Sequence, residues 1–153
     1  MKNRVIIFGA TDTGKRIYED IKELLDEDGI TKGAVAELGV FRGDFAKEIN
    51  KVFCNNKLYL FDTFEGFAES DCDIELEKEY AQKKRTGYFA NTTEQLVLDK
   101  MKYPEQCCIC KGFFPESAKG VEDEFLFVNL DADLYAPTLA GLEYFYPRMV
   151  RGA

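Results

Sequence analysis

Short apolar runs alternate with amphipathic segments along the chain, and this alternation predicts a parallel α/β fold. The apolar runs, which predict buried strands, lie at residues 4–8, 34–36, 58–61, 106–111 and 124–130. Between them, apolar residues recur at helical spacing, and the predicted inward positions are Ile17, Ile21, Leu24 and Leu25, then Phe45, Ile49 and Val52, then Leu96, Val97 and Met101, and finally Leu139, Leu142 and Phe145. We therefore expect a Rossmann-like three-layer sandwich, with a mostly parallel sheet and helices on both faces.

The four strands from Val35 onward are expected in the order 3-2-1-4, numbered along the chain. The 153 residues suggest one domain. Residues 1–32 would supply an extra N-terminal strand and helix, and residues 33–153 the core. We expect the strand at Val5–Phe8 to lie beside the strand at Phe125–Leu130. If it lies elsewhere, that edge of the sheet is open and favours association with a second copy of the chain.

The composition disfavours several classes of function. A formal net charge of −8 opposes binding to nucleic acid or to anionic membranes, and no apolar run approaches the roughly 20 residues of a membrane helix.

The odd number of five cysteines, without a secretory signal, indicates reduced thiols in the cytoplasm. For Cys107, Cys108 and Cys110, buried strand positions are a better explanation than a zinc site. The absence of histidine removes nucleophilic schemes built on Ser–His or Cys–His pairs.

The turn Gly9–Lys15 allows two interpretations. It nearly matches the phosphate-binding pattern Gly-x-x-x-x-Gly-Lys, but Arg16 stands where a Ser or Thr would help to hold magnesium. It also departs from the dinucleotide fingerprint, because Thr11 replaces the middle glycine. One interpretation is a nucleotide-phosphate site, and the other is a strand-to-helix turn capped by Thr or Asp.

Candidate ligand-binding residues follow the predicted strands. Gly39 and Gly43 permit close backbone approach to a ligand, and Asp62 ends the next strand, where a carboxylate holds ribose hydroxyls. Because Glu37 repels phosphate and attracts cations, a ligand with an amine, a sulfonium and a ribose fits better than NAD does. The strand-end groups expected to meet at this edge of the sheet are Glu37, Gly39, Asp62, Gly112, Asp131 and Asp133, and Gly43 lies at the start of the following helix.

The longest segment between predicted strands is highly charged. Residues Ala68–Ala90 have a weak helical pattern and no proline, which is typical of a solvated helix or a mobile lid. Asn91–Glu94 then matches a capping box, which opens a helix that Pro104 ends. Nothing in this segment identifies an acceptor.

Three stretches resemble the macrocin O-methyltransferase (TylF-like) family of class I S-adenosylmethionine-dependent methyltransferases. They are AELGVFRGDFAKEIN, LYLFDTFEGF and FVNLDADLYAPTLAGLEYFYPRMVRG. The resemblance covers about Gly33 to Gly152 and implies methyl transfer to a hydroxyl of a sugar or natural product. It also implies a cofactor site with Glu37, Gly39, Phe41 and Gly43 on the methionine side, Asp62 and Thr63 at the ribose, and Gly112 and Phe113 near the adenine.

The same resemblance implies that Asp131 binds magnesium beside the acceptor hydroxyl and acts in catalysis, with Asp133 as a second metal ligand. A divalent cation lowers the pKa of a hydroxyl and orients it for attack, and a carboxylate can take the proton. An alternative for the Asp pair is a helix N-cap and turn. Family members continue into a fifth strand that ends in an acidic pair with further metal ligands. We therefore expect residues 33–153 to be a partial methyltransferase core, truncated after the fourth strand and its helix.

Two other functions stay open at this point. One is a non-catalytic remnant or interaction module that binds a cofactor or nucleotide. The other is a nucleotide-phosphate binder that uses Gly9–Lys15.

Overall fold

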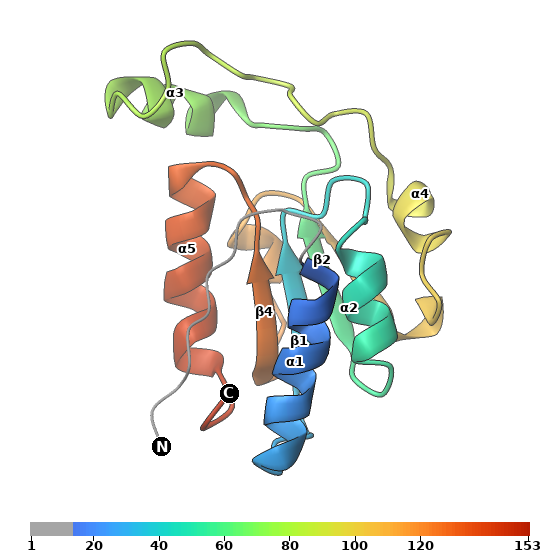
Figure 1. Cartoon of the computed structure of the whole chain (residues 1–153). Coiled ribbons are helices and arrows are strands. Elements are labelled where there is room, and N and C mark those ends of the chain that lie inside the picture. Colours follow the sequence, from blue (N-terminus) through green and yellow to red (C-terminus); the bar gives the residue numbers. More distant parts are fainter. Residues whose placement is uncertain (1–13) are drawn as a thin grey trace.

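Four parallel strands form the centre of the structure (Figure 1), a computed structural model that describes residues 14–153. The strands are β1 (Ala34–Leu38), β2 (Leu58–Asp62), β3 (Cys107–Lys111) and β4 (Phe125–Leu130). Their order across the sheet is β3-β2-β1-β4, and every pairing is parallel. The order 3-2-1-4 predicted from the sequence is confirmed, and it gives β1 a partner on each side.

Helices cover both faces of the sheet. They are α1 (Gly14–Glu27), α2 (Ala46–Val52), α3 (Glu69–Glu77), α4 (Glu94–Leu98) and α5 (Tyr135–Phe145), with short 3-10 turns at Pro104–Gln106, Glu116–Ala118 and Tyr146–Arg148. α1 and α2 pack on one face and α5 on the other (Figure 1). Thr93 caps α4 and accepts a hydrogen bond from the Leu96 N–H at 3.1 Å, as the capping pattern predicts. The three-layer architecture is confirmed.

Side chains of β1 alternate between two hydrophobic cores. Ala36 and Leu38 belong to the core under α5, whereas Val35 belongs to the core under α1 and α2. By the same alternation, Glu37 lies on the Val35 side. Strands covered on both faces are normally apolar throughout, so Glu37 is a polar exception at the centre of the sheet.

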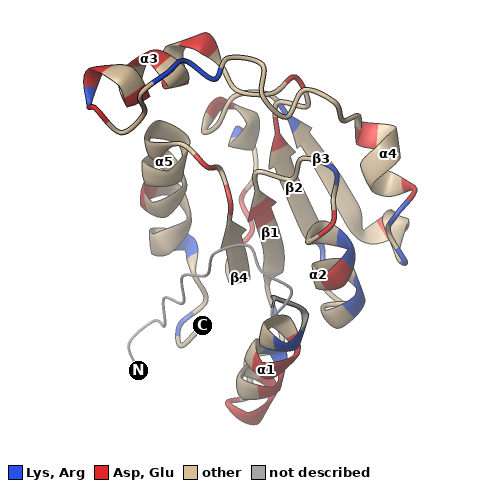
Figure 2. Cartoon of the chain, turned by 45° about the horizontal axis from the view of Figure 1, so that its top comes forward, with Lys and Arg blue, Asp and Glu red and all other residues tan. Residues whose placement is uncertain are grey.

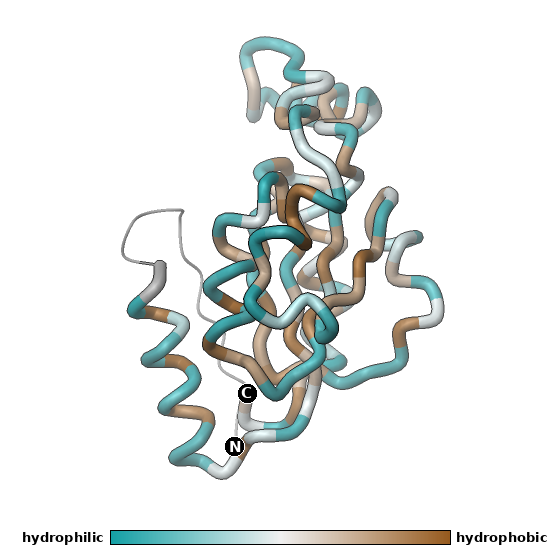
Figure 3. The backbone as a smooth tube through the Cα atoms, turned by 90° about the vertical axis from the view of Figure 1, so that its right-hand side faces the viewer, coloured by the Kyte–Doolittle hydropathy of each residue, from teal (hydrophilic) through white to brown (hydrophobic). Residues whose placement is uncertain are grey.

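Some predicted helix faces are wrong. The predicted inward leucines that are exposed are Leu24, Leu139 and Leu142. In α1, whose alternating hydropathy is visible in Figure 3, Tyr18 takes a buried place that the periodicity does not indicate. In α5 the cause is Gly141, because a Cβ there would lie 2.7 Å from Leu38 Cδ2. The helix therefore approaches the sheet along its glycine rather than along its leucines.

All five cysteines are free thiols. Cys107, Cys108 and Cys110 are only half-buried because β3 is an edge strand, so the expectation of buried positions is wrong for them. Burial nevertheless raises the pKa of Cys107 to about 11 and that of Cys110 to about 12. These thiols are therefore protonated at neutral pH and weakly nucleophilic.

The predicted N-terminal strand at Val5–Phe8 lies outside the described residues, and so does most of the turn Gly9–Lys15. Their placement stays a prediction. Within residues 14–153, the outer edge of β4 pairs at one isolated parallel bridge, between Phe125 and Met149. No helix in this part of the chain is long and apolar enough to cross a membrane.

Candidate functional site

The carboxyl ends of the strands bring the predicted residues together at one edge of the sheet. The Gly39 N–H donates to Phe61 O at 2.9 Å, and the Asp131 N–H donates to Leu38 O at 2.8 Å. Figure 2 shows acidic positions at the ends of β1 and β2 and in the segment between β4 and α5. We call the set Glu37, Gly39, Asp62, Gly112 and Asp131 the strand-end site.

Glu37 is the most deeply buried acid of this site, at 1% exposure. Its Oε1 accepts a hydrogen bond of 2.9 Å from Asn129 Nδ2, but its Oε2 is buried without a hydrogen-bond partner in the described part of the chain. Burial raises the Glu37 pKa well above its usual range, and the nearby carboxylates of Asp131 and Asp62 raise it further. The Asn129 amide opposes this shift, and so, weakly, does the Ala46 N–H, which falls short of hydrogen-bond geometry. A cation beside Oε2 would satisfy this buried oxygen.

Asp62 organises the loop that follows β1. Its Oδ2 accepts hydrogen bonds from the N–H groups of Val40 at 2.7 Å and Phe41 at 2.8 Å. Its Oδ1 accepts one from the Phe64 N–H at 2.7 Å. A carboxylate has roughly four acceptor positions, so one is left for a ligand in this arrangement. A bidentate grip on ribose would require one of the backbone donors to move, and the ribose role stays a prediction.

The two glycines of the predicted cofactor loop are required by packing within the chain. Gly39 has a φ of +88°, and a Cβ there would lie 2.2 Å from the carbonyl oxygen of Asp131. Gly43 has a φ of +74°, and its Cβ would lie 2.9 Å from Val97 Cγ1. The backbone contact at Gly39 excludes a side chain, whereas at Gly43 the Val97 side chain would have to shift and the left-handed φ adds strain. Neither glycine therefore needs a ligand to explain it. This packing role is compatible with the predicted close approach of a cofactor to the two glycines, but it does not test that prediction.

The other predicted cofactor residues lie around this loop. Thr63 is engaged in its own turn, where its Oγ1 donates to Gly66 O at 2.9 Å and accepts from the Glu65 N–H at 3.2 Å. At the end of β3, the Gly112 N–H donates to the backbone oxygen of Asp62 at 3.0 Å. Phe113 follows with a ring that is 54% exposed and therefore free to stack on a planar ligand.

Asp131 and Asp133 follow β4 and interact electrostatically. Burial raises the pKa of Asp131, and Asp133 raises it further. Desolvation also raises the pKa of Asp133, whereas Arg85 lowers it. Asp133 has a left-handed φ of 58°, so the extended strand ends before it and the simple alternation of strand side chains no longer applies. Among residues 14–153, no group of three or more Asp, Glu or Cys side chains is arranged to hold a metal ion, and magnesium binding by this pair stays a prediction.

Residues 69–90, here called the cover segment, pass above the carboxyl ends of the strands from α5 toward α4 (Figure 1). Glu75 in α3 is 5% exposed, and its Oε1 accepts a hydrogen bond of 2.6 Å from the Tyr135 N–H, the first residue of α5. Its Oε2 lies 3.9 Å from Arg85 Nη2. A buried carboxylate at a helix N-terminus is electrostatically favourable. The charged segment is thus an α3 helix and loop anchored to α5.

The cover segment also contacts the loop after β1. Phe89 packs edge-on against Phe41, with ring centroids 4.9 Å apart, and against Phe67 at 5.1 Å. Just beyond this segment, the Thr92 hydroxyl donates to the backbone oxygen of the same Phe41. A movement of the cover segment would therefore disturb the loop that carries Gly39 and Gly43.

Sequence reasoning missed four residues near this site: Tyr18, Glu75, Arg85 and Asn129. Asn129 had a usable signal, because a polar residue in the apolar run Phe125–Leu130 calls for a buried partner. Tyr18 could be found only once α1 is packed on the sheet. Glu75 and Arg85 lie among many charged residues, and nothing in their spacing distinguishes them.

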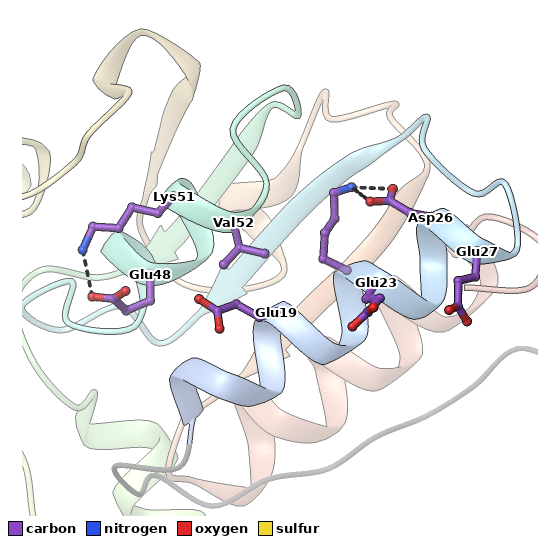
Figure 4. A pocket seen from close by; sticks show the side chains of 8 residues that line it. Glu19, Glu23, Asp26, Glu27, Glu48, Lys51 and Val52 are labelled. Carbon is purple, nitrogen blue, oxygen red and sulfur yellow. Dashed lines mark hydrogen bonds and ion pairs between the residues drawn. The ribbon is translucent and has the colours of Figure 1, made fainter.

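A separate hollow lies between α1 and α2 (Figure 4). It is lined by Glu19, Lys22, Glu23, Asp26, Glu27 and residues of α2. Lys22 pairs with Asp26 at 2.5 Å and Lys51 pairs with Glu48 at 3.0 Å. Such surface pairs are worth about 0–1 kcal/mol, and this acidic hollow has no feature that selects a ligand.

Comparisons with known proteins identify the family of the chain and agree with its fold. A family model described as Macrocin-O-methyltransferase (TylF) matches residues 6–153. The match therefore includes α1, which the resemblance from Gly33 onward leaves out. The solved structure titled "Structure of the O-methyltransferase NovP" has a TM-score of 0.64 and 17% sequence identity, and the alignment covers 88% of this chain and 60% of the NovP chain. At that identity the likeness concerns the fold. No curated protein sequence matches the chain.

Proposed function

Because the chain belongs to the macrocin O-methyltransferase (TylF) family, we propose that it binds S-adenosylmethionine at the strand-end site and takes part in methyl transfer to a hydroxyl of a sugar-like or natural-product acceptor. The chain spans 60% of the NovP chain. The proposal therefore has two separate parts: cofactor binding comes first, and turnover is an additional claim that needs its own test. A cytoplasmic location belongs to the same proposal and is supported by the five free cysteines.

The observation that carries cofactor binding is the unpartnered Oε2 of Glu37. This oxygen is fully buried next to two other carboxylates, so the site favours a positively charged group and disfavours a phosphate. S-Adenosylmethionine brings an ammonium and a sulfonium. Asp62 offers its remaining acceptor position for a ribose hydroxyl, and the exposed Phe113 ring offers a face for the adenine.

Asp131 is proposed as the base that takes the proton of the acceptor hydroxyl. Its raised pKa makes its carboxylate a stronger proton acceptor than an ordinary aspartate. A bound magnesium would polarise the hydroxyl, and Asp131 and Asp133 are the residues that would hold it, with water or acceptor oxygens as other ligands.

The proposal is tested by thermal unfolding with S-adenosylhomocysteine, the demethylated cofactor. A ligand at a hundred times its Kd stabilises the folded state by about 2.7 kcal/mol, so the Tm should rise by several degrees. ATP and NAD should leave the Tm unchanged, and Asp62→Ala should abolish the shift. A chain that responds to ATP but not to S-adenosylhomocysteine, with the response lost in Lys15→Ala, would instead support the phosphate-binding alternative.

Turnover needs its own measurement, which is transfer of a labelled methyl group to a panel of sugar and phenolic hydroxyls with and without Mg²⁺. Transfer that is lost in Asp131→Asn supports the enzyme. Cofactor binding without transfer to any acceptor of the panel would favour the non-catalytic binding module.

A further inference from the structure

We infer that one flank of α5 is an interaction surface for a second copy of this chain, whose own α5 packs against it in the antiparallel direction. The surface, here called the α5 stripe, consists of Tyr135, Leu139, Leu142 and Tyr146, the last of which begins the 3-10 turn after α5. The inference concerns the association of whole chains and is independent of cofactor binding. It gives a role to two leucines that the sequence pattern predicts to be buried and that the structure exposes.

The side chains of the α5 stripe are exposed along one line of the helix. Their exposed fractions are 39% for Tyr135, 39% for Leu139, 38% for Leu142 and 55% for Tyr146. Their spacings of four, three and four residues keep them on nearly the same side of a helix with 3.6 residues per turn. Single exposed apolar residues are common on protein surfaces, but a continuous apolar line is typical of a helix that packs against another helix.

The α5 stripe is turned away from the segment between β3 and β4. Two residues along a helix turn the side chain by about 200°, so Tyr144 points away from Leu142 and Tyr146. The Tyr144 hydroxyl donates to the backbone oxygen of Val121 at 3.2 Å, and its ring packs edge-on against Phe114 with centroids 5.3 Å apart. The stripe therefore lies on the opposite flank of α5, a helix that lies beside the edge strand β4 (Figure 1).

The spacing of the α5 stripe is symmetric, which favours a second copy of the same helix as its partner. The stripe residues lie symmetrically about the peptide bond that follows Ala140, with the leucines inside and the tyrosines outside. A two-fold axis through this point places Leu139 opposite the partner's Leu142 and Tyr135 opposite the partner's Tyr146. Two-fold dimers are the commonest oligomers, and each copy contributes the same surface to them.

The charges beside the α5 stripe favour the antiparallel direction. At one end, Lys78 Nζ lies 5.0 Å from the centroid of the Tyr135 ring. Toward the other end, Glu143 follows Leu142. Both charged side chains are exposed, and neither has an ion-pair partner within residues 14–153. Antiparallel pairing brings Lys78 of one copy toward Glu143 of the other, whereas parallel pairing brings like charges together.

The size of the surface predicts weak association. The stripe continues onto the cover segment at Tyr80, which is 59% exposed and whose ring centroid lies 5.3 Å from that of Tyr135. Five exposed apolar side chains from each copy form an interface at the small end of those in specific complexes. We therefore expect a dimer with a Kd on the order of 10 μM.

Sedimentation equilibrium of the full chain tests the surface, at concentrations from about tenfold below to about tenfold above that Kd. The unchanged chain should convert from monomer to dimer over this range. Leu142→Glu should weaken the dimer by at least about 100-fold, because one substitution places a charge in both halves of a two-fold contact. Leu24→Glu is the matched control, since Leu24 is a 43% exposed leucine of α1 and its replacement should leave the Kd within about twofold.

A double variant tests the direction of the two helices. Leu139→Lys combined with Leu142→Glu sets opposite charges face to face at both contacts of an antiparallel pair, so dimerisation should return to within about tenfold of the unchanged chain. Leu139→Glu combined with Leu142→Glu should stay monomeric. The exposed positions keep the Tm of each variant within a few degrees, which thermal unfolding checks.

Three results would overturn the inference. One is a chain that stays monomeric throughout the concentration range, which would also be the result if residues 1–13 of the same chain covered the stripe. Another is a dimer that Leu142→Glu leaves intact, because such a dimer forms through a different surface. The third is a double variant with opposite charges that associates no better than the variant with two glutamates, which would exclude antiparallel pairing.

Discussion

Asn129 of β4 donates a 2.9 Å hydrogen bond to Glu37 of β1 across the centre of the sheet. The two residues are register partners in adjacent strands, so the amide fixes one oxygen of the carboxylate and leaves the other without a partner. A buried carboxyl group with one oxygen left without a hydrogen-bond partner costs stability, and more so in its charged form. The presence of Glu37 at the strand-end site is explained if a ligand supplies the missing partner of its Oε2.

Replacing Glu37 by Gln should stabilise the chain without ligand and weaken cofactor binding. The folded-state pKa of Glu37 is raised, so the folded chain binds more protons than the unfolded chain above about pH 4.3. Stability is therefore lost as the pH rises from that value through the folded pKa. Chemical denaturation at pH 5 and pH 8 should show a gain for Glu37→Gln that is larger at pH 8.

The control for this prediction is Glu65→Gln, because the Glu65 side chain is 74% exposed. It should change neither stability nor affinity for S-adenosylhomocysteine. A Glu37→Gln chain that is less stable than the unchanged chain at pH 8 would contradict the claim that the buried Glu37 carboxylate costs stability. Unchanged affinity of that variant for S-adenosylhomocysteine would contradict the role of Glu37 in cofactor binding.

Replacing Asp62 by Asn should loosen the loop after β1. The amide can accept at one oxygen but presents N–H groups at the other position, so at least one of the three backbone donors loses its partner. The expected cost is about 1–3 kcal/mol, with faster hydrogen exchange at the amides of Val40, Phe41 and Phe64. Asp44→Asn is the control, since the exposed Asp44 only pairs with lysines and should cost less than about 1 kcal/mol.

Replacing Glu75 by Ala should detach the cover segment from α5. The substitution removes the acceptor of the Tyr135 N–H and the carboxylate near Arg85. A loss of about 1.4 kcal/mol in docking would make tryptic cleavage within residues 78–85 about tenfold faster. Glu77→Ala lies in the same helix at an exposed position and should leave the cleavage rate unchanged. Equal rates in both variants would show that Glu75 does not anchor the segment.

Replacing Gly39 by Ala should be strongly destabilising. A Cβ would lie 2.2 Å from the carbonyl oxygen of Asp131, in a left-handed backbone conformation, so we expect a loss on the order of 2–4 kcal/mol. Gly120 also has a φ of +88°, but a Cβ there would meet nothing within 4 Å, so Gly120→Ala isolates the backbone cost of about 1–2 kcal/mol. Similar losses of unfolding free energy at both positions would show that the contact with Asp131 relaxes easily.

The backbone of the site could be predicted from the sequence more reliably than the side-chain roles. Apolar runs ending in Glu37, Asp62 and Asp131 predict parallel strands whose carboxyl ends meet, and the structure brings these ends together. The role of Asp62 could not be predicted, because its three backbone donors exist only after the loops fold. In α5 the predicted inward position of Phe145 is confirmed, but those of Leu139 and Leu142 are wrong because close approach at Gly141 outweighs hydrophobic periodicity.

Residues from the flanking helices were harder to predict than those at the strand ends. Tyr18 of α1 packs against Phe127 of β4, and Glu75 of the cover segment accepts a hydrogen bond from the Tyr135 N–H. Neither contact follows from local spacing, because each joins segments far apart in the sequence.

Calorimetric titration of S-adenosylhomocysteine into the chain tests the central claim most directly. The account predicts saturable binding of one ligand per chain, with a Kd below about 100 μM, and an affinity that falls in Glu37→Gln, while NAD gives no binding heat. Absence of binding heat for S-adenosylhomocysteine across a range of temperatures, or tighter binding of NAD than of S-adenosylhomocysteine, would contradict a cofactor site at the carboxyl ends of these strands.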